Sequence, residues 1–141
     1  MTRLRMRNIS KSFFGSYANH EVCLDVDSAE IHALLGENGA GKTTLMNILY
    51  GIYRKDGGTI TIDGEEVDFK SPKEAIARSV GMVHQHFTLV PTLTVQQNIT
   101  LGLKDAGYPC SRERQRCAHI ARLATSYGWT IDPSALVREL S

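Results

Sequence analysis

The stretch Gly36-Glu-Asn-Gly-Ala-Gly41-Lys42-Thr43-Thr44 decides how the rest of this sequence is interpreted. It satisfies in full the pattern of a glycine, four residues, and then Gly-Lys-Ser/Thr. Glycines admit backbone angles that other residues avoid, so successive N–H groups can turn inward and form a concave nest for an anion. The lysine adds a full positive charge, and the threonine hydroxyl can ligate Mg²⁺. A random chain of this length matches the pattern less than ~1% of the time, so we predict a phosphate-binding loop.

The residues on both sides of the loop support this prediction. Residues 30–35 form a short apolar run that predicts a buried strand leading into the glycine turn. Leu45, Ile48 and Leu49 share one face of a helix predicted over residues 41–50, and Gly51 is a suitable stop. The positive end of that helix would face the bound phosphate.

The remaining elements are predicted from periodicity and turn residues, and they alternate between strand and helix. Strands are expected at residues 3–9 and 20–26, in a hairpin over 57–64, and at 80–85. Helices are expected to begin at Ser71-Pro72 and to cover residues 94–103, 111–127 and 133–140. The chain therefore reads as an α/β protein.

Composition excludes several classes of protein. The 141 residues carry 16 basic and 15 acidic side chains, so bulk charge gives no support to a nucleic-acid partner. No stretch approaches the ~20 apolar residues that span a bilayer. The three cysteines are scattered, which suggests reduced thiols. Cys110, Cys117 and His119 lie close together but fit no usual zinc spacing.

Four segments together resemble the ATP-binding subunit of an ABC transporter. They are the loop, the helix that ends at Gly51, the 57–64 hairpin, and Gly81-Met-Val-His-Gln85. More narrowly, Gly81-Met-Val-His-Gln-His-Phe and Leu89-Val-Pro-Thr-Leu-Thr-Val95 resemble the simple-sugar and nucleoside importers of bacteria. The resemblance implies a P-loop NTPase fold of the ABC ATPase type. Residues 1–87 would form the P-loop core and an antiparallel β subdomain, and residues 88–141 the start of a helical subdomain.

The resemblance also implies roles for individual residues, with ATP and Mg²⁺ as cofactors. Lys42 and Gln85 would act in catalysis, and Thr43 and Gln85 would reach Mg²⁺. Phe13 matches the aromatic residue that stacks on adenine, with Tyr17 as a weaker rival. The nucleotide-binding set is Phe13, Gly36, Glu37, Asn38, Gly39, Ala40, Gly41, Lys42, Thr43 and Thr44, in which Glu37 and Asn38 would offer mainly backbone N–H groups.

His84 and His86 flank Gln85 and allow two interpretations. They can be a histidine pair for metal binding or proton transfer, or ordinary loop and strand residues of this subfamily. We favour the second interpretation.

Some of the family's machinery lies outside these residues. The sequence ends in Leu140-Ser141, and a Leu-Ser pair opens the signature motif of the family. The rest of that motif, the second strand carboxylate, the glutamate general base and the switch histidine do not follow. We therefore expect the first, truncated part of one nucleotide-binding domain, which binds Mg-ATP but hydrolyses it poorly alone.

In the full-length protein, hydrolysis is expected to energise import of a sugar or nucleoside. The implied partners are transmembrane permease subunits and a second nucleotide-binding domain that forms a dimer, with no nucleic acid. The implied location is cytoplasmic, peripheral on the inner face of the cell membrane. Two alternatives remain: a truncated nucleotide-binding remnant, or a soluble ABC-type ATPase. The stretch over residues 81–95 and the lack of a basic tail argue against the second.

Overall fold

The computed structural model describes residues 2–85, 88–102 and 111–140. These residues form two compact units, Met1–Val83 and His84–Ser141. Residues 86–87 lie outside the described residues, and the subdomain boundary expected after residue 87 stays a prediction.

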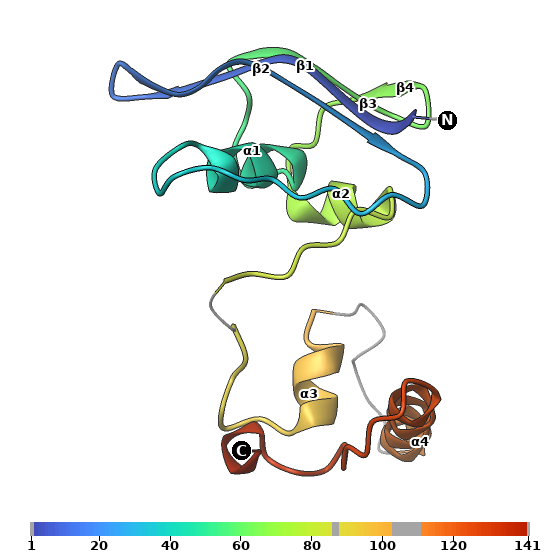
Figure 1. The fold of residues 1–141 in the computed structure, drawn as a ribbon. Helices are drawn as coiled ribbons and strands as arrows, with labels where there is room; N and C mark the ends of the chain where they lie inside the picture. The colour runs from blue at the N-terminus through green and yellow to red at the C-terminus, as the bar shows by residue number, and fades with distance from the viewer. Residues whose placement is uncertain (1, 86–87, 103–110, 141) are drawn as a thin grey trace. The chain divides into compact units, whose positions relative to one another are not determined.

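A four-stranded antiparallel sheet organises the first unit (Figure 1). Its strands are β1 (Thr2–Phe13), β2 (Ser16–Asp27), β3 (Gly57–Ile62) and β4 (Glu65–Val67), in the order β2-β1-β3-β4. The strand predictions at 3–9 and 20–26 and the hairpin over 57–64 are confirmed, although β1 and β2 extend further. Val22, Leu24 and Val26 are half-buried while their neighbours in β2 are exposed, as the period of two requires.

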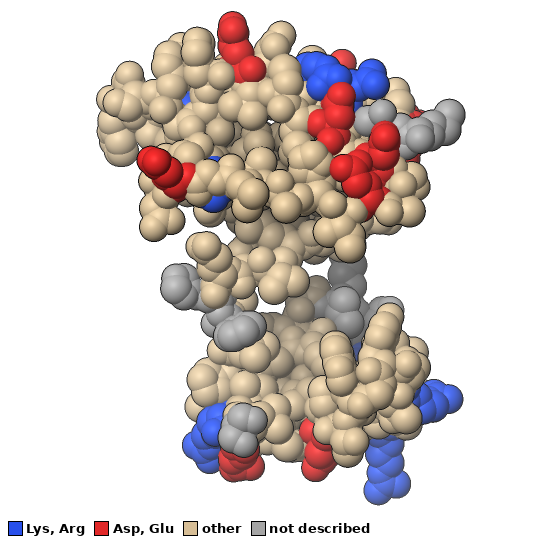
Figure 2. All heavy atoms as spheres, viewed as in Figure 1, with Lys and Arg blue, Asp and Glu red and all other residues tan. Residues whose placement is uncertain are grey.

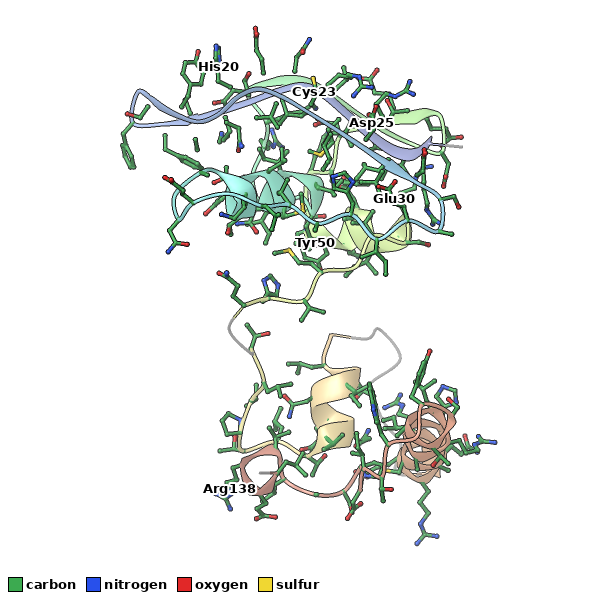
Figure 3. The ribbon with its side chains drawn as sticks, viewed as in Figure 1. His20, Cys23, Asp25, Glu30, Tyr50 and Arg138 are labelled. Carbon is green, nitrogen blue, oxygen red and sulfur yellow. The ribbon has the colours of Figure 1, made fainter. Side chains whose placement is uncertain are left out.

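Two helices cover one face of this sheet, α1 (Lys42–Leu49) and α2 (Pro72–Ala77) (Figure 1). Both predictions are confirmed: Tyr50 caps the end of α1 before Gly51, and α2 starts with proline after Ser71. The side chains between the helices and the sheet form one hydrophobic core. It consists of Met6, Ile9, Leu45, Ile48, Ile60, Ile62, Val67, Phe69 and Ala75. The other face of the sheet carries exposed side chains, among them His20 and Cys23 (Figure 3).

Two predicted strands, at residues 30–35 and 80–85, are wrong. Neither segment has regular secondary structure, and Ile31 and Leu35 are 100% and 90% exposed. The physical reason is the lack of a partner, because a strand needs a neighbour for its N–H and C=O groups. Among the described residues, β1 to β4 pair only with one another. An apolar run alone therefore did not produce a strand.

The second unit contains α3 (Val95–Thr100), α4 (Ser111–Ser126) and a 3₁₀ helix, η2 (Val137–Glu139). Thr94 and Gln97 form a reciprocal capping box at the start of α3. The backbone N–H of Val95 donates to Ala135 O at 3.0 Å, which ties α3 to the C-terminal segment. Of the three predicted helices, 94–103 is shorter in the structure, with its last residue outside the described residues. The helix 111–127 is confirmed, and 133–140 gives only the 3₁₀ turn. None of the helices in the described ranges is long and apolar enough to cross a membrane.

We expect alanine substitutions of two isoleucines to change the free energy of unfolding by very different amounts. Ile60→Ala removes a side chain that is 2% exposed, so it should lower the free energy of unfolding by about 2–5 kcal/mol. Ile31→Ala changes an exposed side chain and should stay within about 0.5 kcal/mol. Denaturant unfolding of both variants measures this. A loss for Ile31→Ala as large as that for Ile60→Ala would contradict the exposed placement of residues 30–35.

Candidate functional site

The glycine-rich loop of residues 36–41 leads directly into α1. Within the loop, the N–H of Ala40 donates to Glu37 O at 3.2 Å. The first hydrogen bond of the helix runs from Leu45 N–H to Gly41 O at 2.9 Å. The N–H groups of Lys42, Thr43 and Thr44 therefore precede it and belong to the first turn, which has no acceptor within a helix. These groups and the helix dipole give the site a partial positive charge.

The Lys42 side chain folds back over its own loop. Its Nζ donates to the carbonyl oxygens of Gly36 and Glu37, both at 2.7 Å. An ammonium group has three donors, so a further N–H remains for a ligand. The full charge thus lies at the loop that leads into α1.

The backbone and side-chain groups around Lys42 are suited to bind an anion and a metal ion. Residues 37–40 are exposed, so their backbone is open to a ligand. Thr43 is also exposed at the start of α1, which leaves its hydroxyl available as an oxygen ligand. The backbone N–H groups and the ammonium can donate hydrogen bonds to a phosphate, and the hydroxyl oxygen can ligate Mg²⁺. This set of groups fits a phosphate with a bound Mg²⁺.

The loop rests on strand β2 at Gly41. This residue has φ +82°, and an added Cβ would lie 2.1 Å from Ala18 O and 2.7 Å from Asn19 Nδ2. Both values are too short for real atoms, so only glycine fits. The Asn19 amide donates from Nδ2 to Gly41 O at 3.2 Å. Asn19 was not predicted, because one asparagine in a strand, 22 positions from the glycine, carries no sequence signal.

Phe13, at the end of β1, packs against a second aromatic ring. The Phe13 and Tyr53 rings meet edge to face, with centroids 5.2 Å apart and planes at 72°. Lys11 Nζ lies 5.4 Å from the Phe13 centroid. Tyr53 was not predicted, since a tyrosine after a helix is an unremarkable surface residue. The rival Tyr17 is exposed and its ring lies 4.5 Å from that of His20.

Asp56 stabilises the C-terminal end of β1, which contains Phe13. Its carboxylate accepts hydrogen bonds from Lys11 Nζ at 2.7 Å, Ser12 N–H at 2.7 Å and Ser12 Oγ at 2.9 Å. The bond from Lys11, then those from Ser12, lower the pKa of Asp56 to about 2. The carboxylate therefore stays ionised at neutral pH and keeps these residues in place.

Gln85 belongs to the second unit and is exposed. Its expected role in catalysis and Mg²⁺ binding remains a prediction. His84 is exposed as well, and His86 lies outside the described residues.

Charge is mixed over the visible surface. Acidic and basic side chains lie interspersed in Figure 2, without a large patch of basic residues on that face. Arg7, for example, pairs with Asp25 through two hydrogen bonds of 2.6 and 2.5 Å. The positive charge of the loop itself comes from Lys42 and the backbone N–H groups at the start of α1.

Comparison with known proteins places these features in a family. A family model described as ABC transporter matches residues 19–141. A glucose import ATP-binding protein of Haloferax volcanii is 53% identical over 112 residues, which cover 77% of this chain and 20% of the relative. A guanosine import ATP-binding protein of Bacillus subtilis is 44% identical and covers 98% of this chain. A ribose import ATP-binding protein of Bacillus cereus is 43% identical and covers 99%. The chain spans only 20–28% of the length of these relatives.

Solved structures show the same fold at low identity. An ATP-binding cassette of an ABC transporter in its ADP conformation has a TM-score of 0.81 and 22% identity. A nucleotide-free cassette has a TM-score of 0.79 and also 22% identity. Both matches cover 100% of this chain, and 59% and 60% of the cassettes. The predicted fold, an ABC-type P-loop NTPase with an antiparallel sheet, is therefore confirmed.

Because Gly41 lies so close to β2, we expect a single added methyl group at this position to disturb the loop and lower the stability of the chain. Gly41→Ala should push the loop off β2, speed hydrogen exchange at the Leu45 amide, and destabilise the chain. Gly15→Ala is a matched control, because Gly15 has φ +84° but nothing within 4 Å of the added Cβ. The control should cost about 1–2 kcal/mol from backbone strain alone. Gly41→Ala should cost roughly 1–3 kcal/mol more.

Equal losses for the two variants would show that Gly41 is needed only for its backbone angle. That result would contradict the close contact with Ala18 and Asn19.

Proposed function

This chain belongs to the ABC transporter family, and from that premise we propose that its glycine-rich loop binds the phosphates of Mg-ATP. The observation that carries the proposal is the placement of Lys42. Its ammonium lies on the loop, 2.7 Å from two loop carbonyls, and the loop leads directly into the first turn of α1. A full charge and a helix N-terminus that meet at one exposed loop form a site for polyphosphate.

We assign the phosphate contacts by the chemistry of each group. The N–H groups of the loop and of the first turn of α1 cradle the phosphate oxygens, with Glu37 and Asn38 contributing backbone rather than side chain. Lys42 binds the β- and γ-phosphates. Thr43 ligates Mg²⁺ through its hydroxyl, and the ion when bound neutralises negative charge on the phosphates.

The adenine is proposed to stack on Phe13. Tyr53 packs against this ring edge to face, and Asp56 holds the flanking Lys11 and Ser12. A supported aromatic ring suits a flat base, which is apolar on both faces. Tyr17 is less suited, because it lies against His20 instead.

For the longer protein, we propose that ATP hydrolysis drives import of a small solute. The relatives are named as importers of glucose, guanosine and ribose, so the solute class is a sugar or nucleoside. Gln85 would orient the attacking water, and the general base would come from outside these 141 residues. Permease subunits and a second nucleotide-binding domain would be the partners, at the inner face of the cell membrane.

Loss of the Lys42 charge should abolish most nucleotide binding. Lys42→Ala should weaken ATP affinity at least about 30-fold, because a charge-assisted contact is worth about 1.5–3 kcal/mol and the triphosphate carries several charges. Lys73→Ala is the control, since Lys73 is exposed on α2, outside the loop. Isothermal titration with Mg-ATP measures both. ATP affinity in Lys42→Ala equal to that of the wild type would refute the proposed site.

Phe13 and Phe14 provide a matched pair for the adenine contact. Phe13→Ala should weaken ATP binding about 5- to 100-fold, the worth of one stacked base, and leave inorganic tripolyphosphate binding nearly unchanged. Phe14→Ala should change neither, because this neighbouring ring is fully exposed in the turn. The same titrations with both ligands provide the test. Equal losses for ATP and tripolyphosphate in Phe13→Ala would assign Phe13 to packing instead.

A further inference from the structure

Asn19 is a buried polar residue directly behind the glycine-rich loop. Its side chain is on β2 and the residue is 5% exposed. Nδ2 donates to Gly41 O at 3.2 Å, while Oδ1 is the buried side-chain atom that lacks a hydrogen-bond partner in the described part of the chain. A buried amide oxygen without a donor costs free energy. Sheet stability alone therefore does not account for asparagine at this position.

The carbonyl that Asn19 holds is at a junction of the loop and the helix. Gly41 O accepts two hydrogen bonds, from Leu45 N–H at 2.9 Å and from Asn19 Nδ2 at 3.2 Å. The first bond belongs to α1, and the second comes from a different element, β2. Two donors from two elements fix the direction of this carbonyl better than the helix bond alone.

The direction of the Gly41 carbonyl determines that of the next N–H. A peptide unit is planar and trans, so the Gly41 C=O and the Lys42 N–H point in opposite directions. A carbonyl held toward β2 and α1 therefore turns the Lys42 N–H away from them. That N–H is the first of the helix, where it has no acceptor within α1.

The close packing around Gly41 strengthens this arrangement. Ala18 O and Asn19 Nδ2 leave no room for a Cβ on Gly41. The Gly41 peptide is thus held by close contact with Ala18 and Asn19 of β2 and by the hydrogen bond from the Asn19 amide. Tilting it requires breaking the bond from Asn19.

We propose that Asn19 is a positioning residue for the phosphate-binding loop: its Nδ2 holds the Gly41 carbonyl and thereby aims the Lys42 N–H at the bound phosphate. The inference rests on the proposed function, since it names how β2 sets up that same site. Asn19 would affect recognition of the phosphates and not recognition of the base. Every ligand with the polyphosphate should therefore depend on Asn19 to the same degree.

Two substitutions and one control test the inference on the full 141-residue chain. Asn19→Leu removes the donor and the unpaired oxygen at similar volume, and Asn19→Asp replaces the donor with an acceptor. Asn19→Leu should weaken binding of Mg-ATP and of inorganic tripolyphosphate by the same factor, about 3- to 10-fold, the worth of one hydrogen bond. Asn19→Asp should weaken binding of both ligands at least as much, because its carboxylate also repels the polyphosphate. Asn19→Leu should do so without lowering the free energy of unfolding.

Asn98→Asp is the matched control, because Asn98 Nδ2 donates to Val90 O, Leu93 O and Thr94 O in the second unit. It should destabilise the chain and leave the affinity of the folded protein unchanged. If Asn19→Leu binds both ligands as the wild type does, the inference is overturned. A loss in Asn19→Asp alone would overturn it too, since added charge would then be the cause.

A measurement on the wild type keeps the inference testable if the variants fail to fold. By NMR, the Asn19 side-chain amide should exchange with water much more slowly than that of the exposed Asn38. Tripolyphosphate should also shift the Lys42 amide resonance. Equal exchange rates for the two asparagines would overturn the inference. Failure of the wild type to bind either ligand would instead refute the proposed function, so the two failures are distinguishable.

Discussion

The contact between Gly41 and strand β2 is the constraint on which the site depends. Ala18 O and the Asn19 amide lie so close that a Cβ at Gly41 would overlap them. This contact fixes where the loop ends and where α1 begins. Leu45 and Ile48 then reach the core beneath the sheet, and Lys42 folds over the loop. Loop geometry, helix placement and core packing thus follow from one close approach of two backbones.

The sequence predicted those features that local residues determine. The 36–44 motif, the helix that starts at Lys42, the 57–64 hairpin and the two long strands all follow from spacing and turn residues. The strand predicted at 30–35 is wrong, because its apolar residues would need a partner strand that the described residues do not provide. Asn19 and Tyr53 were missed for a related reason. Their roles come from contacts with Gly41 and Phe13, which are far away in the sequence.

The two ends of the proposed nucleotide site are held by different physical means. At the phosphate end, backbone N–H groups and one ammonium lie at the start of α1. At the adenine end, the Phe13 ring packs against Tyr53, and the ionised Asp56 holds the preceding residues Lys11 and Ser12. Both ends are in the unit Met1–Val83, so this unit contains every residue of the proposed site except Gln85. The low pKa of Asp56 means that the adenine end keeps its hydrogen bonds well below neutral pH.

The most direct test is an NMR titration of the wild-type chain with Mg-ATP, in which each backbone amide is followed separately. We expect large shifts for residues 38–44, smaller shifts at Phe13 and Tyr53, and saturation of all of them with one dissociation constant. Adding AMP should not shift the loop amides, because it lacks the β- and γ-phosphates. Saturable ATP binding with no shifts in residues 38–44 would contradict the claim that this loop binds the nucleotide.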